Sequence, residues 1–267
     1  MGHHRTLRLL GVTTLLLICS LKYVDGQTAV KYTAGALHGF LSIRSEGGVH
    51  LGYGELSQIA VGDRVTAHLV YHFLDGSLDD ETTVFTQGKT FQFVSDHHIQ
   101  RGPFFPKPSD ITVEANGQVT MRSVDKNGEA KVETNTMDIP PDLSNGMVGT
   151  ILQNIPADAP EFKVGMIVPS GKGRAIKLDV TPDAKQTFRT AGATRKASVF
   201  RVKTEIGGAA GVIAPLVGKK PGDILVWVLE GEPPTLVRIV GPLGEGTATV
   251  SLEVAGTSFP KNPAAHK

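Results

Sequence analysis

The chain has 267 residues, of which 40% are hydrophobic, with 27 lysines and arginines against 26 aspartates and glutamates. A charge balance this even gives no basic surface that could track phosphates, so we expect no nucleic-acid partner. The single cysteine, Cys19, lies in a segment that we expect to be removed. Cysteine nucleophiles, thiolate metal sites and disulfides are therefore excluded from the remaining protein.

Residues 1–26 have the pattern of a secretory signal peptide. A charged start, MGHHRTLR, precedes an apolar run from Leu9 to Leu21, and Gly26 is a small residue at a suitable cleavage point. The run is shorter than the about 20 apolar residues that a comfortable membrane span requires. We expect an exported protein, periplasmic or secreted, that begins at Gln27 and keeps no membrane span; an uncleaved anchor is the alternative.

The rest of the chain has the pattern of an antiparallel sheet. Short segments rich in Val, Ile, Thr and Phe are separated by turns of Gly, Asp, Asn and Pro. Predicted strands span 37–44, 63–74, 77–85, 90–96, 118–124, 195–205, 224–229, 235–240 and 247–254. Short turns between neighbours favour an up-and-down meander. We predict a mainly β fold, a curved antiparallel half-barrel or open barrel.

This fold is predicted to be one domain over residues 27–259, with two halves meeting near 156–160 as the alternative. A flexible tail is expected over 260–267. The segment PPDLSNGMVGTILQNIP departs from the strand pattern, because its apolar residues fall on one helical face. It predicts one helix over 143–155, capped by Asp142 or Ser144 and ended by Pro156. The helix packs on the sheet or acts as a lid over a cavity.

The stretch HLVYHFLDGSLDDETTVF predicts a hairpin with a two-residue turn at Asp75-Gly76. This register places His72 opposite Asp79. A second two-residue turn, at Gln87-Gly88, places Asp96 opposite Asp79, with His98 on the same side. The other side then collects only apolar residues, which supports the register: Leu69, Tyr71, Phe73, Leu78, Val84, Phe91 and Phe93.

His72, Asp79, Asp96 and His98 form the candidate metal site on the polar face. His97 points to the opposite face, because neighbouring side chains alternate along a strand. Two imidazoles and two carboxylates could hold zinc or manganese, and a metal-bound water could attack a substrate. The alternatives are a polar ligand cleft without metal and an ordinary solvated sheet face.

The sequence RGPFFPKP lacks ladder donors at its three prolines, so it predicts a loop or edge segment. Phe104 and Phe105 in it either cover the sheet or bind a peptide. Motifs for a nucleophile elbow, a P-loop, an HEXXH zinc site and an EF-hand are missing from the sequence. Asp79, Glu81 and Asp96 leave glycoside hydrolysis open. We favour a protein that is not an enzyme.

The segments FLDGSLDDETTVF, SDHHIQRGPFFPKP and EIGGAAGVIAPLVGKKPGDILVWVLEGEPPTLVRIVGPL, in this order after a signal peptide, resemble a family of exported bacterial proteins of unknown function. The long meander with a mid-chain helix is also similar in outline to periplasmic lipoprotein carriers, which fold a curved sheet around an apolar cavity. That second resemblance implies an architecture alone.

Three functions follow as expectations. The leading one is an envelope or secreted protein that binds a lipid or another apolar or amphipathic ligand between the sheet and the helix. The predicted binding residues are Phe73, Phe91, Phe93, Ile151 and Leu152. The second is a metal-assisted hydrolase that uses the candidate metal site, the one reading that needs a cofactor. The third is a structural envelope protein that binds other proteins through the RGPFFPKP loop.

Overall fold

The computed structural model describes residues 27–124, 127–170, 172–190, 192–205 and 222–255, so the predicted signal peptide and tail lie outside the described residues. These residues form fourteen strands and one helix, α1 (Val148–Asn154). The strands are β1 (Leu37–Ser45), β2 (His50–Val61), β3 (Arg64–Phe73), β4 (Leu78–Gln87), β5 (Phe91–Arg101), β6 (Ser109–Glu114), β7 (Gln118–Val124), β8 (Ala130–Thr136), β9 (Phe162–Val168), β10 (Arg174–Thr190), β11 (Ala193–Thr204), β12 (Ile224–Leu229), β13 (Thr235–Pro242) and β14 (Thr249–Val254).

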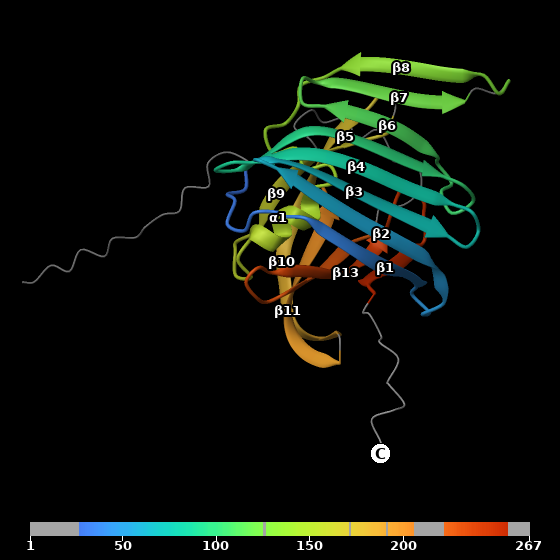
Figure 1. The fold of residues 1–267 in the computed structure, drawn as a ribbon. Coiled ribbons are helices and arrows are strands. Elements are labelled where there is room, and N and C mark those ends of the chain that lie inside the picture. The colour runs from blue at the N-terminus through green and yellow to red at the C-terminus, as the bar shows by residue number, and fades with distance from the viewer. Residues whose placement is uncertain (1–26, 125–126, 171, 191, 206–221, 256–267) are drawn as a thin grey trace, which may run out of the picture.

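All fourteen strands belong to one antiparallel sheet in the order β8-β7-β6-β5-β4-β3-β2-β1-β14-β13-β12-β11-β10-β9. The chain runs outward from β1 to β8, crosses through α1, and returns from β9 to β14 beside β1 (Figure 1). Strands β8 and β9 are the two ends of the sheet, which is therefore open. The predicted mainly β fold, a curved antiparallel sheet with one mid-chain helix, is confirmed.

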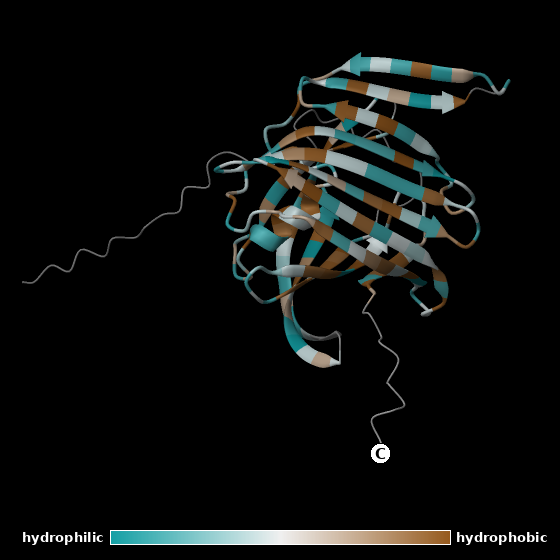
Figure 2. Ribbon diagram, viewed as in Figure 1, coloured by the Kyte–Doolittle hydropathy of each residue, from teal (hydrophilic) through white to brown (hydrophobic). Residues whose placement is uncertain are grey.

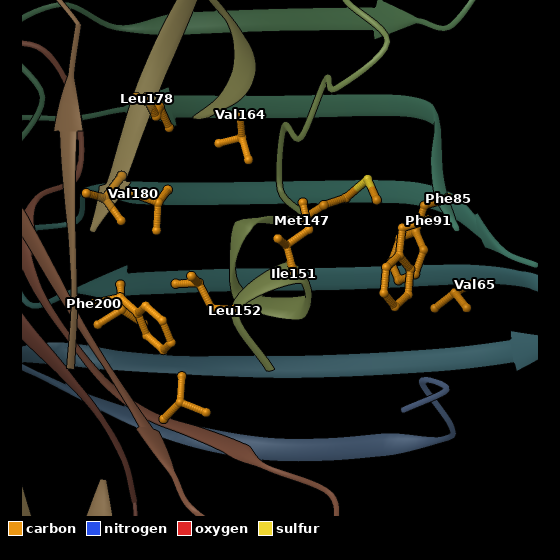
Figure 3. Packing of buried hydrophobic residues seen from close by; sticks show 13 residues of the cluster. Val65, Phe85, Phe91, Met147, Ile151, Leu152, Val164, Leu178, Val180 and Phe200 are labelled. Atoms are coloured by element: carbon orange, nitrogen blue, oxygen red, sulfur yellow. The ribbon is translucent and has the colours of Figure 1, made fainter. Parts of the chain in front are cut away.

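The sheet curves around α1, and residues from both halves meet there in the first apolar core. Val65 and Phe85 come from the first half, Phe200 comes from the second half, and Ile151 and Leu152 come from α1 (Figure 3). Along the strands of the first half, hydrophobic and hydrophilic residues alternate (Figure 2), as expected when one face of a sheet is buried. The prediction that the helix packs on the sheet is confirmed.

The helix is shorter than predicted, because it begins after Gly146 rather than at residue 143. Gly146 has φ +61°, in the left-handed region that does not continue a helix. Ser144 N donates to Gly165 O over 2.8 Å, and the Asn145 side chain bonds the backbone of Ile167. Residues 142–145 thus lie along β9. The helix has no side-chain cap, so the predicted capping is wrong, whereas its end before Pro156 is confirmed.

The RGPFFPKP loop turns inward and completes a second apolar core. Phe105 is 2% exposed. The rings of Phe104 and Phe73 stack with their centroids 4.3 Å apart. Phe104 and Phe105 both pack with residues of β1, β3 and β14. The prediction that these aromatic side chains cover the sheet is confirmed.

Candidate functional site

The first hairpin has a register one residue away from the predicted one. Asp79 faces Tyr71, and His72 faces Leu78. The turn contains three residues, Leu74 to Gly76, and Gly76 has φ +85°; Phe73 N donates to Ser77 O over 3.0 Å. A shift of one residue reverses the faces of β3 relative to β4.

His72 therefore points to the outer face of the sheet, where its ring lies 5.2 Å from that of Tyr53. The prediction that His72 shares a face with Asp79, Asp96 and His98 is wrong. The prediction that Leu78 and Val84 lie on the apolar face is also wrong, because these two residues alternate with the buried residues of β4. Leu69, Tyr71 and Phe73 lie on the inner face instead.

The second hairpin differs from the predicted register by an even number of residues over the site. Asp79 faces Gln100, Glu81 faces His98, and Thr83 faces Asp96, because the loop after Gln87 is longer than predicted and β5 carries a bulge. An even shift keeps each side chain on its own face. Asp79, Asp96 and His98 consequently share the inner face.

These residues form an interior polar cluster, which we define as Asp79, Glu81, Thr83, Asp96, His98 and Gln100. His98 Nε2 lies 2.8 Å from Asp79 Oδ1, and His98 Nδ1 lies 3.9 Å from Glu81 Oε1. Gln100 donates to Asp79 Oδ2 over 2.9 Å, and Thr83 donates to Asp96 Oδ1 over 2.7 Å. The members of the cluster come from β4 and β5, and Gln100 also donates to Leu243 O after β13 over 2.9 Å.

The members of the interior polar cluster differ in exposure. Asp96 is 1% exposed, and its Oδ2 has no hydrogen-bond partner in the part of the chain that the structure describes. The Asp79 side chain is 6% exposed, whereas those of His98 and Glu81 are 23% and 21% exposed. Glu81 and His98 are therefore the members that solvent reaches, with Asp79 and Asp96 behind them.

Burial and mutual charge shift the protonation of these groups. Burial raises the pKa of Glu81 to about 8, and the Asp96 charge adds to this, while His98 opposes it. Burial also raises the pKa of Asp96, against the hydrogen bond from Thr83, the charge of His98 and the nearby Asn145 side chain. Burial lowers the pKa of His98, but the charge of Glu81 and the contact with Asp79 outweigh it and raise that pKa to about 10. At neutral pH, His98 is an imidazolium.

Tyr71 borders the interior polar cluster and depends on a glycine for its position. A Cβ on Gly54 would lie 2.5 Å from Tyr71 Cδ1, so the ring can lie across β2 only where β2 has no side chain. Burial raises the pKa of the Tyr71 hydroxyl, with the charges of Asp79 and Glu81 adding to the effect.

Sequence reasoning missed Thr83, Gln100 and Tyr71 as neighbours of the candidate site. Gln100 could have been found, because it follows Asp96 and His98 at the two-residue spacing of one strand face.

The outer face of the same strands carries separate histidine–aspartate pairs. His97 Nε2 lies 3.0 Å from Asp110 Oδ1, and His68 Nε2 lies 2.9 Å from Asp80 Oδ1. The side chains of His97 and His68 are each 43% exposed. The prediction that His97 and His98 point to opposite faces is confirmed, and His97 serves as a matched control for His98.

The five predicted binding residues are divided between the two cores. Phe91, Ile151 and Leu152 belong to the first core, with Phe93 packed at its edge, whereas Phe73 belongs to the second. Within the described ranges, no three His, Cys, Asp or Glu side chains converge to hold a metal ion. A shallow cavity of about 180 Å³ lies elsewhere, between β7, β8 and Lys172.

Among the residues that the structure describes, no helix has the length and apolar character required to cross a membrane. No protein-family profile and no curated protein matches the chain. Among solved structures, the chain is similar to a β-barrel-like protein of the domain of unknown function DUF1849 from Brucella abortus. The two are 9% identical with a TM-score of 0.42, over 84% of this chain and 98% of that one.

Proposed function

We propose that this protein is an exported binding protein, periplasmic or secreted, for an amphipathic molecule that carries an amine. The apolar part of the ligand lies on the inner face of the sheet beneath α1, and its ammonium group lies at the interior polar cluster. The observation that carries this proposal is a set of incompletely paired acidic groups between two apolar cores.

The charge of the interior polar cluster favours a cationic group. In their ionised forms Asp79, Glu81 and Asp96 are three carboxylates against one imidazolium, that of His98, and a bound ammonium group would favour these ionised forms by lowering the raised pKa values of Glu81 and Asp96. Burying carboxylates without enough partners is costly, and here part of the cost is met by raised pKa values. An ammonium group donates three hydrogen bonds, and Asp96 Oδ2 is an acceptor that receives no hydrogen bond from the described residues.

The apolar part of the ligand requires space that α1 now fills. Ile151 and Leu152 are 4% and 1% exposed against the sheet, so α1 must move outward for a chain to enter. A helix of seven residues without a side-chain cap has little stability of its own. Its displacement would open a surface lined by Phe91 and Phe93.

Native mass spectrometry of the protein purified from a secreting host tests this function. We expect the wild type to carry an amine-containing amphipathic adduct, and the Glu81→Gln variant to lose it. The matched control is Asp80→Asn, because Asp80 directly precedes Glu81 in β4 and pairs with His68 on the outer face. It should keep the adduct.

Other masses would contradict the proposal. An adduct on both variants would show that Glu81 does not bind the ligand, and a protein without any adduct would favour the structural envelope function. A zinc or manganese mass that disappears with Glu81→Gln would instead support the metal-assisted hydrolase.

A further inference from the structure

The two edge strands of the sheet, β8 and β9, differ in whether their outer backbone groups form hydrogen bonds. At β9, Gly165 N donates to Asp142 O over 3.0 Å and Gly165 O accepts from Ser144 N, so residues 142–145 cover this edge. Strand β8 pairs with β7 alone within the described ranges. An uncovered edge strand is a template for pairing with another strand.

The backbone of β8 presents alternate residues to this open edge. Met137 N donates to Gly117 O over 3.0 Å, so residue 137 faces β7. Backbone groups alternate in direction along an antiparallel strand. Lys131 and Glu133 therefore face β7, whereas Ala130, Val132 and Thr134 direct their N–H and C=O groups outward.

We infer that β8 is a self-association edge, at which a second copy of this chain pairs antiparallel with β8 about a two-fold axis at Val132. In this register Val132 and the partner's Val132 exchange both backbone hydrogen bonds. Lys131 then faces the partner's Glu133, and Glu133 faces the partner's Lys131. These two pairs occupy the positions without backbone hydrogen bonds, where opposed side chains are closest.

Charge selects this register over the adjacent ones. Because alternate residues of β8 direct their backbone groups outward, the two-fold axis must pass through a residue and not between two residues. The nearest alternative registers therefore have the axis at Lys131 or at Glu133. An axis at Lys131 would place that lysine against the partner's Lys131, and an axis at Glu133 would place two glutamates together. Like charges directly opposite are destabilising. An axis at Val132 creates two opposite-charge pairs instead.

The apolar surface of β8 supports the same pairing. Val132 is 62% exposed, and Val124, which lies on the same face of β7, is 70% exposed. Pairing about Val132 brings the two copies of this valine together and reduces the exposure of both. A contact of about five residues on each side is small, so the dimer should be weak and reversible.

The test is analytical ultracentrifugation of the wild type, Lys131→Glu, Glu133→Lys and an equimolar mixture of the two variants. The wild type should dimerise with increasing concentration. Each single variant places like charges opposite one another, so its dissociation constant should rise at least about tenfold. In the mixture every cross-strand pair again has opposite charges, so dimers should reappear as heterodimers.

The mixture separates pairing between copies from effects within one chain. Lys131 Nζ lies 2.8 Å from Glu133 Oε1 of the same chain, and both variants break this ion pair. Mixing cannot restore it, so recovery in the mixture requires contact between two chains. A wild type that stays monomeric, single variants that associate as well as the wild type, or a mixture with no gain would each overturn the inference.

Discussion

The free energy of unfolding should fall by about 3 kcal/mol or more when the pH is raised from about 6 to about 10. Glu81 has a pKa of about 8 in the folded protein against an ordinary value of 4.5. For His98 the two values are about 10 and 6.5. Both groups bind their proton more tightly in the folded state than in the unfolded state.

The sign of the effect is the same for both groups. The contribution of Glu81 is complete below pH 4.5 and is lost as the pH rises through 8. That of His98 is complete below pH 6.5 and is lost as the pH rises through 10. Asp96, whose pKa is also raised, acts in the same direction. Urea unfolding measured across this range should therefore give a stability that decreases steadily.

A variant of His98 locates the effect in the interior polar cluster. His98→Gln should lower the unfolding free energy at pH 6 by about 3 kcal/mol, because Asp79 keeps a buried charge without its cationic partner. It should also flatten the dependence above pH 7. His97→Gln removes an outer-face histidine of the same strand and should change stability by less than about 1 kcal/mol. Equal effects of the two variants would refute this assignment.

Replacing Gly146 by alanine should destabilise the protein by about 3–5 kcal/mol. A Cβ at this position would lie 1.8 Å from Thr83 Oγ1 and 3.2 Å from Asp96 Oδ1. Either the backbone before α1 or the Thr83 side chain must therefore shift, and either shift disturbs the hydrogen bond between Thr83 and Asp96.

Gly62→Ala is the matched control for Gly146→Ala. Gly62 has φ +62° against +61° for Gly146, but nothing lies within 4 Å of its added Cβ. It should cost only the strain of the left-handed backbone, about 1–2 kcal/mol. The difference between the two variants in chemical denaturation measures the contact with Thr83. Equal losses would mean that the segment before α1 does not pack against the interior polar cluster.

Much of the fold could be predicted because alternating apolar residues and turn glycines act locally. Two of the five strands that the sequence prediction omitted, β2 and β10, have local features that only packing explains. Strand β2 contains Gly52 and Gly54, which weaken a strand on their own, but the ring of Tyr71 lies against Gly54. Strand β10 contains Pro182, which is accommodated where its register with β11 shifts.

The prediction of the candidate site depended on the lengths assumed for two turns. Asp75-Gly76 suits a two-residue turn, yet the structure uses Gly76 in a three-residue turn, and this one-residue difference moved His72 out of the site. Asp79, Asp96 and His98 still share one face, because the observed register of β4 with β5 differs from the predicted register by an even number of residues. Local sequence does not decide between the two turns, since both place a glycine at positive φ.

Isothermal titration with dodecylamine and with dodecanoate, both kept below micelle formation at pH 7, tests most directly whether the interior polar cluster binds the polar end of a ligand. The two probes have opposite charges, and the alkyl chain of dodecylamine is longer by one carbon, which accounts for only about a fourfold difference in affinity. We predict that dodecylamine binds at least about tenfold more tightly, and that Asp96→Asn removes this preference. Asp110→Asn, which alters the outer-face partner of His97, should preserve it. Equal binding of the two probes, or tighter binding of dodecanoate, would contradict the account.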